Sequence, residues 1–116
     1  MFNPLDFLDL ADELKPSNGN EAKIRTSISR AYYAAFLYAR EWLRANNWTL
    51  YDDGRDHRKV QEGLEYYKGR GLRDKMAYLR RDYRNEADYN LKRGFNKRDA
   101  SNAIILAQIV VKGCSP

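Results

Sequence analysis

Residues 20–45 contain neither glycine nor proline, and their apolar side chains recur at the spacing of one helix face. A helix of this length is stable in a small domain when other elements cover its apolar face. Small side chains at Ala31, Ala35 and Ala39 allow a neighbouring helix to approach closely. The segment therefore predicts the central helix of a bundle. Its apolar face comprises Ile24, Ile28, Ala31, Tyr32, Ala35, Ala39, Trp42 and Leu43.

Helix signals recur along the rest of the chain, and no segment shows a convincing strand pattern. Asn3 is a natural N-cap before Pro4, Asn96 is another N-cap, and Gly113 is a C-terminal stop. A turn is expected at residues 17–19 and a polar loop at 46–56. Gly69 and Gly71 separate the third helix from the fourth. We expect an all-α fold, an up-and-down bundle of four to five helices in one domain over residues 1–116. The predicted helices are 4–14, 20–45, 56–68, 72–87 and 97–113.

Composition excludes several classes of protein. No apolar run approaches the roughly 20 residues of a membrane span, and the longest, residues 103–111, is expected to be a core helix. Residues 1–14 carry four acidic side chains and no Lys or Arg, so they lack the positive flank of a signal peptide. The single cysteine, Cys114, rules out an intrachain disulfide and a cysteine-based zinc cluster. We expect a cytoplasmic protein without a metal or other cofactor and without a membrane partner.

Positive charge is concentrated in one part of the chain. Residues 68–84 carry seven basic and two acidic side chains, a surplus that accounts for the whole net charge of +5. Arg73, Arg80 and Arg84 follow one another at helical spacing beside a predicted buried stripe. Either a polyanionic partner or a solvated helix face explains this pattern. The predicted buried stripe consists of Leu72, Met76, Leu79 and Tyr83.

Tyrosine and arginine occur together in a way that suits unpaired RNA, since aromatic rings stack on bases and arginines contact the backbone. Helical spacing assigns Tyr32 and Tyr83 to the core and leaves Tyr33, Tyr78 and Tyr89 as exposed rings. The candidate nucleic-acid-binding residues are Arg30, Tyr33, Arg73, Arg80, Arg81 and Arg84.

The last helix is apolar on two faces. Such a helix either occupies a central place in the bundle or is shared with a second protomer. We expect a homodimer that buries either this helix or the alanine-rich long helix. Packing of Ile105 and Ile109 inside the domain would argue against it.

Two segments resemble the HEPN domain family. Residues 25–36, Arg-Thr-Ser-Ile-Ser-Arg-Ala-Tyr-Tyr-Ala-Ala-Phe, are similar to the family's second-helix signature. Residues 84–89, Arg-Asn-Glu-Ala-Asp-Tyr, take the place of its Arg-x4-6-His motif. The resemblance implies a short HEPN-like helical bundle, usually dimeric, whose active members cut RNA without metal between two protomers. It also implies a role in toxin–antitoxin or antiviral defence systems, or as partner of a minimal nucleotidyltransferase.

The chain departs from that motif at one position, because Tyr89 stands where catalytic members have histidine. Arg84 could stabilise charge on a phosphate, but tyrosine is a poor base near neutral pH. Two residues could replace the missing group. His57 could face the same cleft as acid or base, or be an exposed first-turn residue behind an Asp56 cap. Asp88 could act as base, or pair with Arg84 and hold it.

Arg84, Asp88, Tyr89 and His57 are therefore the candidate catalytic residues, and the sequence leaves the enzymatic question open. One function is a weak or degenerate metal-free endoribonuclease. The alternative is a non-catalytic module that binds nucleic acid or nucleotide, or partners a nucleotidyltransferase. A purely structural scaffold is the third possible function.

Overall fold

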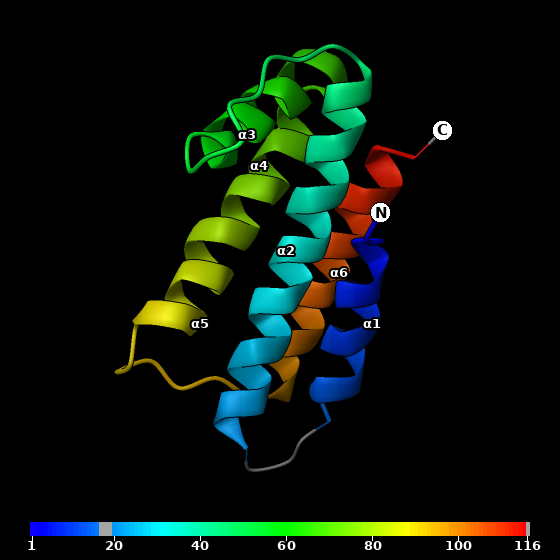
Figure 1. Cartoon of the computed structure of the whole chain (residues 1–116). Coiled ribbons are helices and arrows are strands. Elements are labelled where there is room, and N and C mark those ends of the chain that lie inside the picture. The colour runs from blue at the N-terminus through cyan, green and yellow to red at the C-terminus, as the bar shows by residue number, and fades with distance from the viewer. Residues whose placement is uncertain (17–19, 116) are drawn as a thin grey trace.

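A computed structural model describes residues 1–16 and 20–115 and contains helices without a strand in those ranges. The all-α prediction is confirmed, whereas the predicted turn at 17–19 lies outside the described residues. The elements are α1 (Leu5–Leu14), α2 (Glu21–Ala45), α3 (Asp56–Lys68), α4 (Arg70–Tyr78), η1 (Leu79–Arg84), α5 (Asn85–Tyr89) and α6 (Lys97–Gly113). Because α4, η1 and α5 follow one another without a break, they form one long helical segment, and the described residues contain five helical segments. Figure 1 shows this continuous segment beside α2.

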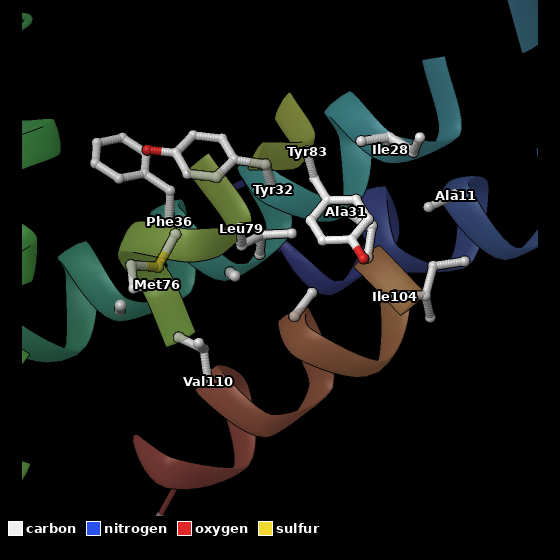
Figure 2. Packing of buried hydrophobic residues seen from close by; sticks show 14 of the residues in the cluster. Ala11, Ile28, Ala31, Tyr32, Phe36, Met76, Leu79, Tyr83, Ile104 and Val110 are labelled. Atoms are coloured by element: carbon white, nitrogen blue, oxygen red, sulfur yellow. The ribbon is translucent and has the colours of Figure 1, made fainter. Parts of the chain in front are cut away.

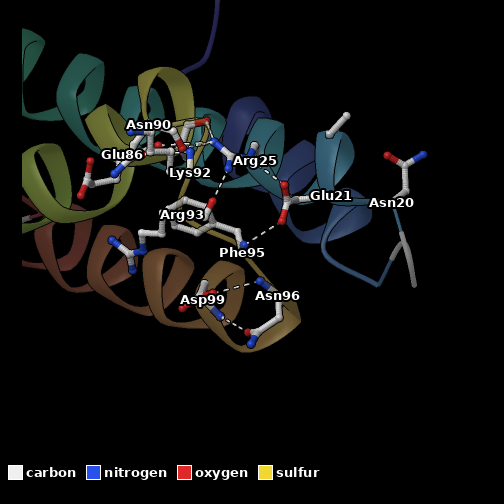
Figure 3. Close-up of polar contacts among 12 residues, drawn as sticks. Asn20, Glu21, Arg25, Glu86, Asn90, Lys92, Arg93, Phe95, Asn96 and Asp99 are labelled. Atoms are coloured by element: carbon white, nitrogen blue, oxygen red, sulfur yellow. Dashed lines mark hydrogen bonds and ion pairs between the residues drawn. The ribbon is translucent and has the colours of Figure 1, made fainter.

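Asparagine side chains stabilise three helix starts. The Asn3 side chain accepts a hydrogen bond from Leu5 N–H at 3.0 Å, and that of Asn20 accepts one from Lys23 N–H at 3.1 Å. Asn96 and Asp99 form a reciprocal capping box at the start of α6 (Figure 3). These contacts satisfy backbone N–H groups that have no partner inside the helix.

Helix α2 is the central element, with α1 and α6 along one side and α3 and the α4–α5 segment along the other (Figure 1). Tyr32 and Phe36 of α2 lie close to Met76 and Leu79, and Val110 of α6 completes this part of the core (Figure 2). Ala31, Ala35 and Ala39 are fully buried and allow close helix packing. The placement of Tyr32 and Tyr83 in the core is also confirmed.

The fourth predicted helix differs from the observed one in two respects. It begins at Arg70 rather than Leu72, because Gly69 alone breaks the chain, with φ of +92°, and Gly71 lies inside α4. Its middle, Leu79–Arg84, is π-helical, and Asn85 N–H bonds to the Arg80 carbonyl five residues earlier. The wider turn changes the face on which later residues lie. A uniform 3.6-residue pattern could not reveal it.

Helix α6 buries one face and exposes part of the other. Ala103, Ala107 and Val110 are fully buried, whereas Ile105 is 53% and Ile109 is 38% exposed. The alternative with both isoleucines inside the domain is therefore wrong for a single chain, and the homodimer stays a prediction. No helix in the described part of the chain is long and apolar enough to span a membrane.

Candidate functional site

Arg84 lies where the η1–α5 segment packs against α2. Its Nε donates to Asp88 at 3.0 Å, its Nη1 to the Asn85 side chain at 3.1 Å and its Nη2 to the Tyr33 hydroxyl at 2.9 Å. Its side chain is 13% exposed. The guanidinium folds back onto α2, and the pairing with Asp88 is the second of the two alternatives that the sequence left open for that residue. Three of its donor groups already have partners.

Asp88 links the same two elements. One of its carboxylate oxygens accepts from both Arg84 and the Ser29 hydroxyl of α2, the latter at 3.1 Å. Of the two alternatives for this residue, the geometry contains the ion pair that holds Arg84.

Arg80 differs from Arg84 four residues later in the same segment. Its Nε is buried and has no hydrogen-bond partner. Among the residues that the structure describes, no carboxylate forms an ion pair with it. Arg80 lines an open groove of about 660 Å³, together with Arg84, Asn85, Glu86, Tyr89 and Asn90. The groove thus contains one arginine committed to the protein and one without an anionic partner.

His57 reaches this region from α3. Its Nδ1 lies 2.5 Å from the Tyr32 hydroxyl, and its ring stacks on Phe36 with centroids 4.4 Å apart. Burial, together with the charges of Arg80 and Arg84, lowers the pKa of His57 to about 4. Burial also raises the pKa of the Tyr32 hydroxyl, which therefore stays protonated and donates to Nδ1. Near neutral pH, His57 is uncharged and carries its proton on Nε2.

This geometry corrects one expectation for His57, because it is half-buried and near the two arginines rather than an exposed first-turn residue. Nor does Asp56 cap α3. Its buried carboxylate instead accepts the N–H groups of Tyr51 and Asp52 at 2.8 and 2.9 Å and closes the preceding loop.

Of the three tyrosine rings predicted to be exposed, one packs against the protein and two are exposed. Tyr33 is half-buried against Arg84 rather than free, and the Arg30 guanidinium lies 5.1 Å from its ring centroid. Tyr89 is 71% exposed, and the Arg84 guanidinium lies 5.5 Å from its ring centroid. Tyr78 is also exposed, but it lines a different groove with Leu106 of α6.

The arginine stripe is not continuous. Arg73 pairs with Asp74 at 2.7 Å and with Glu65 at 3.4 Å and does not line the Arg80 groove. Arg81 pairs with Asp82 at 2.8 Å and lines the groove on the α6 side. Of the candidate nucleic-acid-binding residues, the fold brings Arg80, Arg84, Tyr33 and Arg30 into one contiguous region and leaves Arg73 and Arg81 outside it.

Arg25 has a structural role that sequence reasoning missed (Figure 3). Its guanidinium donates to the carbonyl groups of Ala87 at 2.9 Å, Asn90 at 3.0 Å and Arg93, and its Nε donates to Glu21. Glu21 in turn accepts the N–H of Phe95 at 2.9 Å, which lowers the pKa of the Glu21 carboxyl. The network holds the end of α5, next to Asp88 and Tyr89, against α2. Its partners are backbone groups more than 60 residues away, so no local pattern signals them.

The described residues contain no group of three or more His, Cys, Asp or Glu side chains that could hold a metal ion. The side chains that line the groove are two guanidinium groups, the amide groups of Asn85 and Asn90, the Glu86 carboxylate and the exposed phenol ring of Tyr89. Such a set suits binding of a phosphate group next to an aromatic base.

Comparisons with known proteins give one family and one relative. The family model of the HEPN domain matches residues 5–115. The chain is 35% identical over 109 residues to an uncharacterized protein of Methanocaldococcus jannaschii, a match that covers 79% of this chain and 66% of that protein. The chain therefore spans just under two thirds of the length of this relative. No solved structure matches the chain.

Proposed function

The chain belongs to the HEPN domain family, and from this premise we propose that it is an RNA-directed protein of a toxin–antitoxin or antiviral defence system. The observation that carries the proposal is the groove at Arg80 and Arg84, because the Arg80 side chain lines it and forms no ion pair among the described residues. Its Nε is enclosed and has no partner in the protein either. Phosphate oxygens carry the opposite charge and accept strong hydrogen bonds from guanidinium groups.

RNA supplies both chemical groups for which the groove is suited. Its backbone carries the phosphate, and an unpaired base presents an aromatic face to Tyr89. Arg30 extends the cationic surface past Tyr33 along α2. Single-stranded RNA therefore fits the site better than a small inorganic anion alone.

The catalytic form of this function is a weak or degenerate metal-free endoribonuclease that acts as a dimer. Cleavage needs a proton acceptor for the 2′-hydroxyl, a donor for the leaving oxygen and a cation for the phosphate. Arg84 supplies the cation, and the Nε2 proton of His57 can serve as donor. The exposed Ile105 and Ile109 on α6 support burial of this face against a second copy.

A non-catalytic module is the second candidate, and a specific observation favours it. The two candidate bases that the sequence offered, Asp88 and His57, are both engaged by protein groups, because Asp88 is paired with Arg84 and the Nδ1 of neutral His57 accepts from the Tyr32 hydroxyl. Such a site binds RNA or a nucleotide without cutting it. In this form the chain would act as partner of a minimal nucleotidyltransferase.

Replacement of Tyr89 by histidine separates the two forms. If the chain is a degenerate endoribonuclease, Tyr89→His restores an imidazole at the motif position and should raise cleavage of single-stranded RNA near pH 7 by about 10²-fold. Tyr89→Phe is the matched control and should leave cleavage unchanged. Light scattering at micromolar concentration checks the dimer. Unchanged activity of Tyr89→His in a folded, RNA-binding dimer would exclude the catalytic form, and absence of RNA binding would exclude both.

A further inference from the structure

We propose that the Arg80 groove is a subsite for one unpaired nucleotide, in which Arg80 binds the phosphate, Tyr89 stacks on the base and Arg84 is a positioning residue. This inference rests on the proposed function, because it assigns a ligand and separate roles within the same site. It reverses the role that the motif suggests for Arg84, which would otherwise be the phosphate ligand.

Arg84 is engaged by the protein on three sides. Asp88, Asn85 and the Tyr33 hydroxyl each accept from a different nitrogen of its guanidinium. A phosphate that took these donors would leave the Asp88 charge and the Tyr33 hydroxyl without their partner. Arg84 therefore shapes the floor of the groove and holds α5 against α2.

Arg80, unlike Arg84, is not held by hydrogen bonds to protein groups among the described residues. Its Nε is buried without a partner, and its charge is not neutralised by an ion pair in the described part of the chain. Burial is the main cause of the lowered pKa of His57 and the raised pKa of Tyr32, and the Arg80 charge adds to the first shift and opposes the second. The Arg80 side chain lines the groove, and a phosphate there would compensate this charge without breaking a contact that the protein makes.

Tyr89 provides the place for the base. Its ring is 71% exposed, and the Arg84 guanidinium lies 5.5 Å from the ring centroid. The side-chain oxygens of Asn85 and Asn90 accept from Arg84 and from Lys92 N–H, which leaves their amide N–H groups free to donate. Glu86 adds an acceptor on the same groove. These groups can meet the mixed donors and acceptors of a base edge.

The ligand must be unpaired for this arrangement to work. A base inside a duplex is stacked on both faces and its edge is paired, so neither Tyr89 nor the amide groups could reach it. The Glu86 carboxylate also disfavours a second phosphate close to the base position. The structure therefore favours a single nucleotide of single-stranded RNA over duplex RNA and over phosphate alone.

Binding of a short fluorescent oligouridine to the full chain, measured over a range of salt concentrations, tests the assignment. Arg80→Ala should weaken binding about 10- to 100-fold and make the log–log salt slope shallower by about 0.7. Arg81→Ala is the matched control. It removes the same charge at the next residue, where the arginine side chain is paired with Asp82. It should change affinity by less than about 3-fold.

Two further variants test the other roles. Tyr89→Ala should weaken binding about 10-fold, and Tyr89→Phe, which keeps the aromatic ring, should recover most of that loss. Arg84→Ala, measured well below its unfolding temperature, should bind more weakly but keep the wild-type salt slope, because Arg84 is not the phosphate ligand. A purely structural role for Arg80 would not produce its shallower slope.

The results distinguish this inference from the function on which it rests. If wild-type protein does not bind single-stranded RNA at low salt, the proposed function and this inference are both wrong. If RNA binds but Arg80→Ala equals Arg81→Ala, or only Arg84→Ala changes the slope, the assignment of roles is wrong and the proposed function stands. Equal binding of duplex RNA, or unchanged binding of Tyr89→Ala, would likewise overturn the nucleotide subsite alone.

Discussion

Arg25 on α2 and Arg80 on η1 are both largely enclosed arginines, yet their surroundings differ sharply. Arg25 donates to several backbone carbonyls and to the Glu21 carboxylate. Arg80 has a buried Nε without a partner and no ion pair within the described residues. An arginine side chain thus stabilises the fold through its hydrogen bonds at position 25, whereas at position 80 it lacks such partners within the described residues.

The difference teaches how to separate structural from functional charge in this molecule. A guanidinium whose donors are all used by the protein stabilises the fold and has little to offer a ligand. One whose donors remain free lowers stability slightly and is retained where a ligand satisfies it. Arg84 lies between these extremes, since it is bonded to protein groups at the edge of the groove.

Removal of Arg25 should give the largest effect on stability. Arg25→Ala leaves the carbonyls at the end of α5 and in the following loop without their charged donor, and we expect a loss of about 3 kcal/mol in the free energy of unfolding. Urea denaturation measures it. Arg25→Lys should recover part of the loss, because a lysine cannot reach all the carbonyls at once. A loss below about 1 kcal/mol would show that solvent replaces these contacts readily.

The fold was largely predictable because its helices are marked locally. Periodic apolar residues and the asparagine caps gave the helices and most of their ends. The Arg25 network was not predictable, because it joins α2 to backbone groups near residue 90. The π-helical turn was equally hidden, since Leu72, Met76, Leu79 and Tyr83 fit an uninterrupted α-helix as well as the observed segment.

Arg84→Ala should destabilise the chain less than Arg25→Ala does. It breaks the Asp88 ion pair and the Tyr33 contact, but the pair is at the groove edge, where water can solvate Asp88, so we expect about 1 to 2 kcal/mol. A double-mutant cycle with Asp88→Asn isolates the pair. A loss equal to that of Arg25→Ala would place Arg84 among the purely structural arginines, and no loss would leave it free to act as a ligand.

The pH dependence of stability should report the burial of His57 and the positive charge of Arg80 beside it. The pKa of His57 is about 4 in the folded chain and near 6.5 in the unfolded chain, so between these values the unfolded chain binds more protons. Stability should therefore fall as pH is lowered through this window. The carboxyl groups of Glu21, Glu41 and Asp53, whose pKa values are lowered, also reduce stability as the pH falls, but only below about pH 5.5, so the upper part of the window belongs to His57.

NMR titration of His57, the single histidine, measures this pKa directly. Arg80→Ala should raise the pKa toward 6.5 and flatten the pH dependence in part, since burial still acts, whereas Arg25→Ala should leave the pKa unchanged. A wild-type pKa near 6.5 would mean that His57 is exposed and that the positive groove is not built as described.

The sequence allowed the candidate site residues to be proposed, but it did not reveal how they are arranged. Arg84, Asp88, Tyr89 and His57 were all candidates, but their states depend on contacts between segments distant in sequence. The Tyr32 hydroxyl places the proton of His57, and the Ser29 hydroxyl and Tyr33 hold Asp88 and Arg84. Helical spacing groups Arg80 with Arg73 and Arg84. The fold keeps Arg80 and Arg84 in one groove, whereas Arg81 lines a different groove and Arg73 lines neither of the two.

Arg81→Ala should give the smallest effect and so sharpen the contrast with Arg80. The Arg81 side chain is 72% exposed and pairs with its neighbour Asp82, an arrangement that contributes little to stability. We expect a change within about 0.5 kcal/mol in the free energy of unfolding, measured by urea denaturation. Arg80→Ala removes the same charge. If the two variants differ in the pKa of His57 or in RNA binding, the difference therefore comes from the position of the charge. Identical behaviour of the two variants in every assay would show that only the total charge of the chain matters. Arg80 would then have no specific role in the groove.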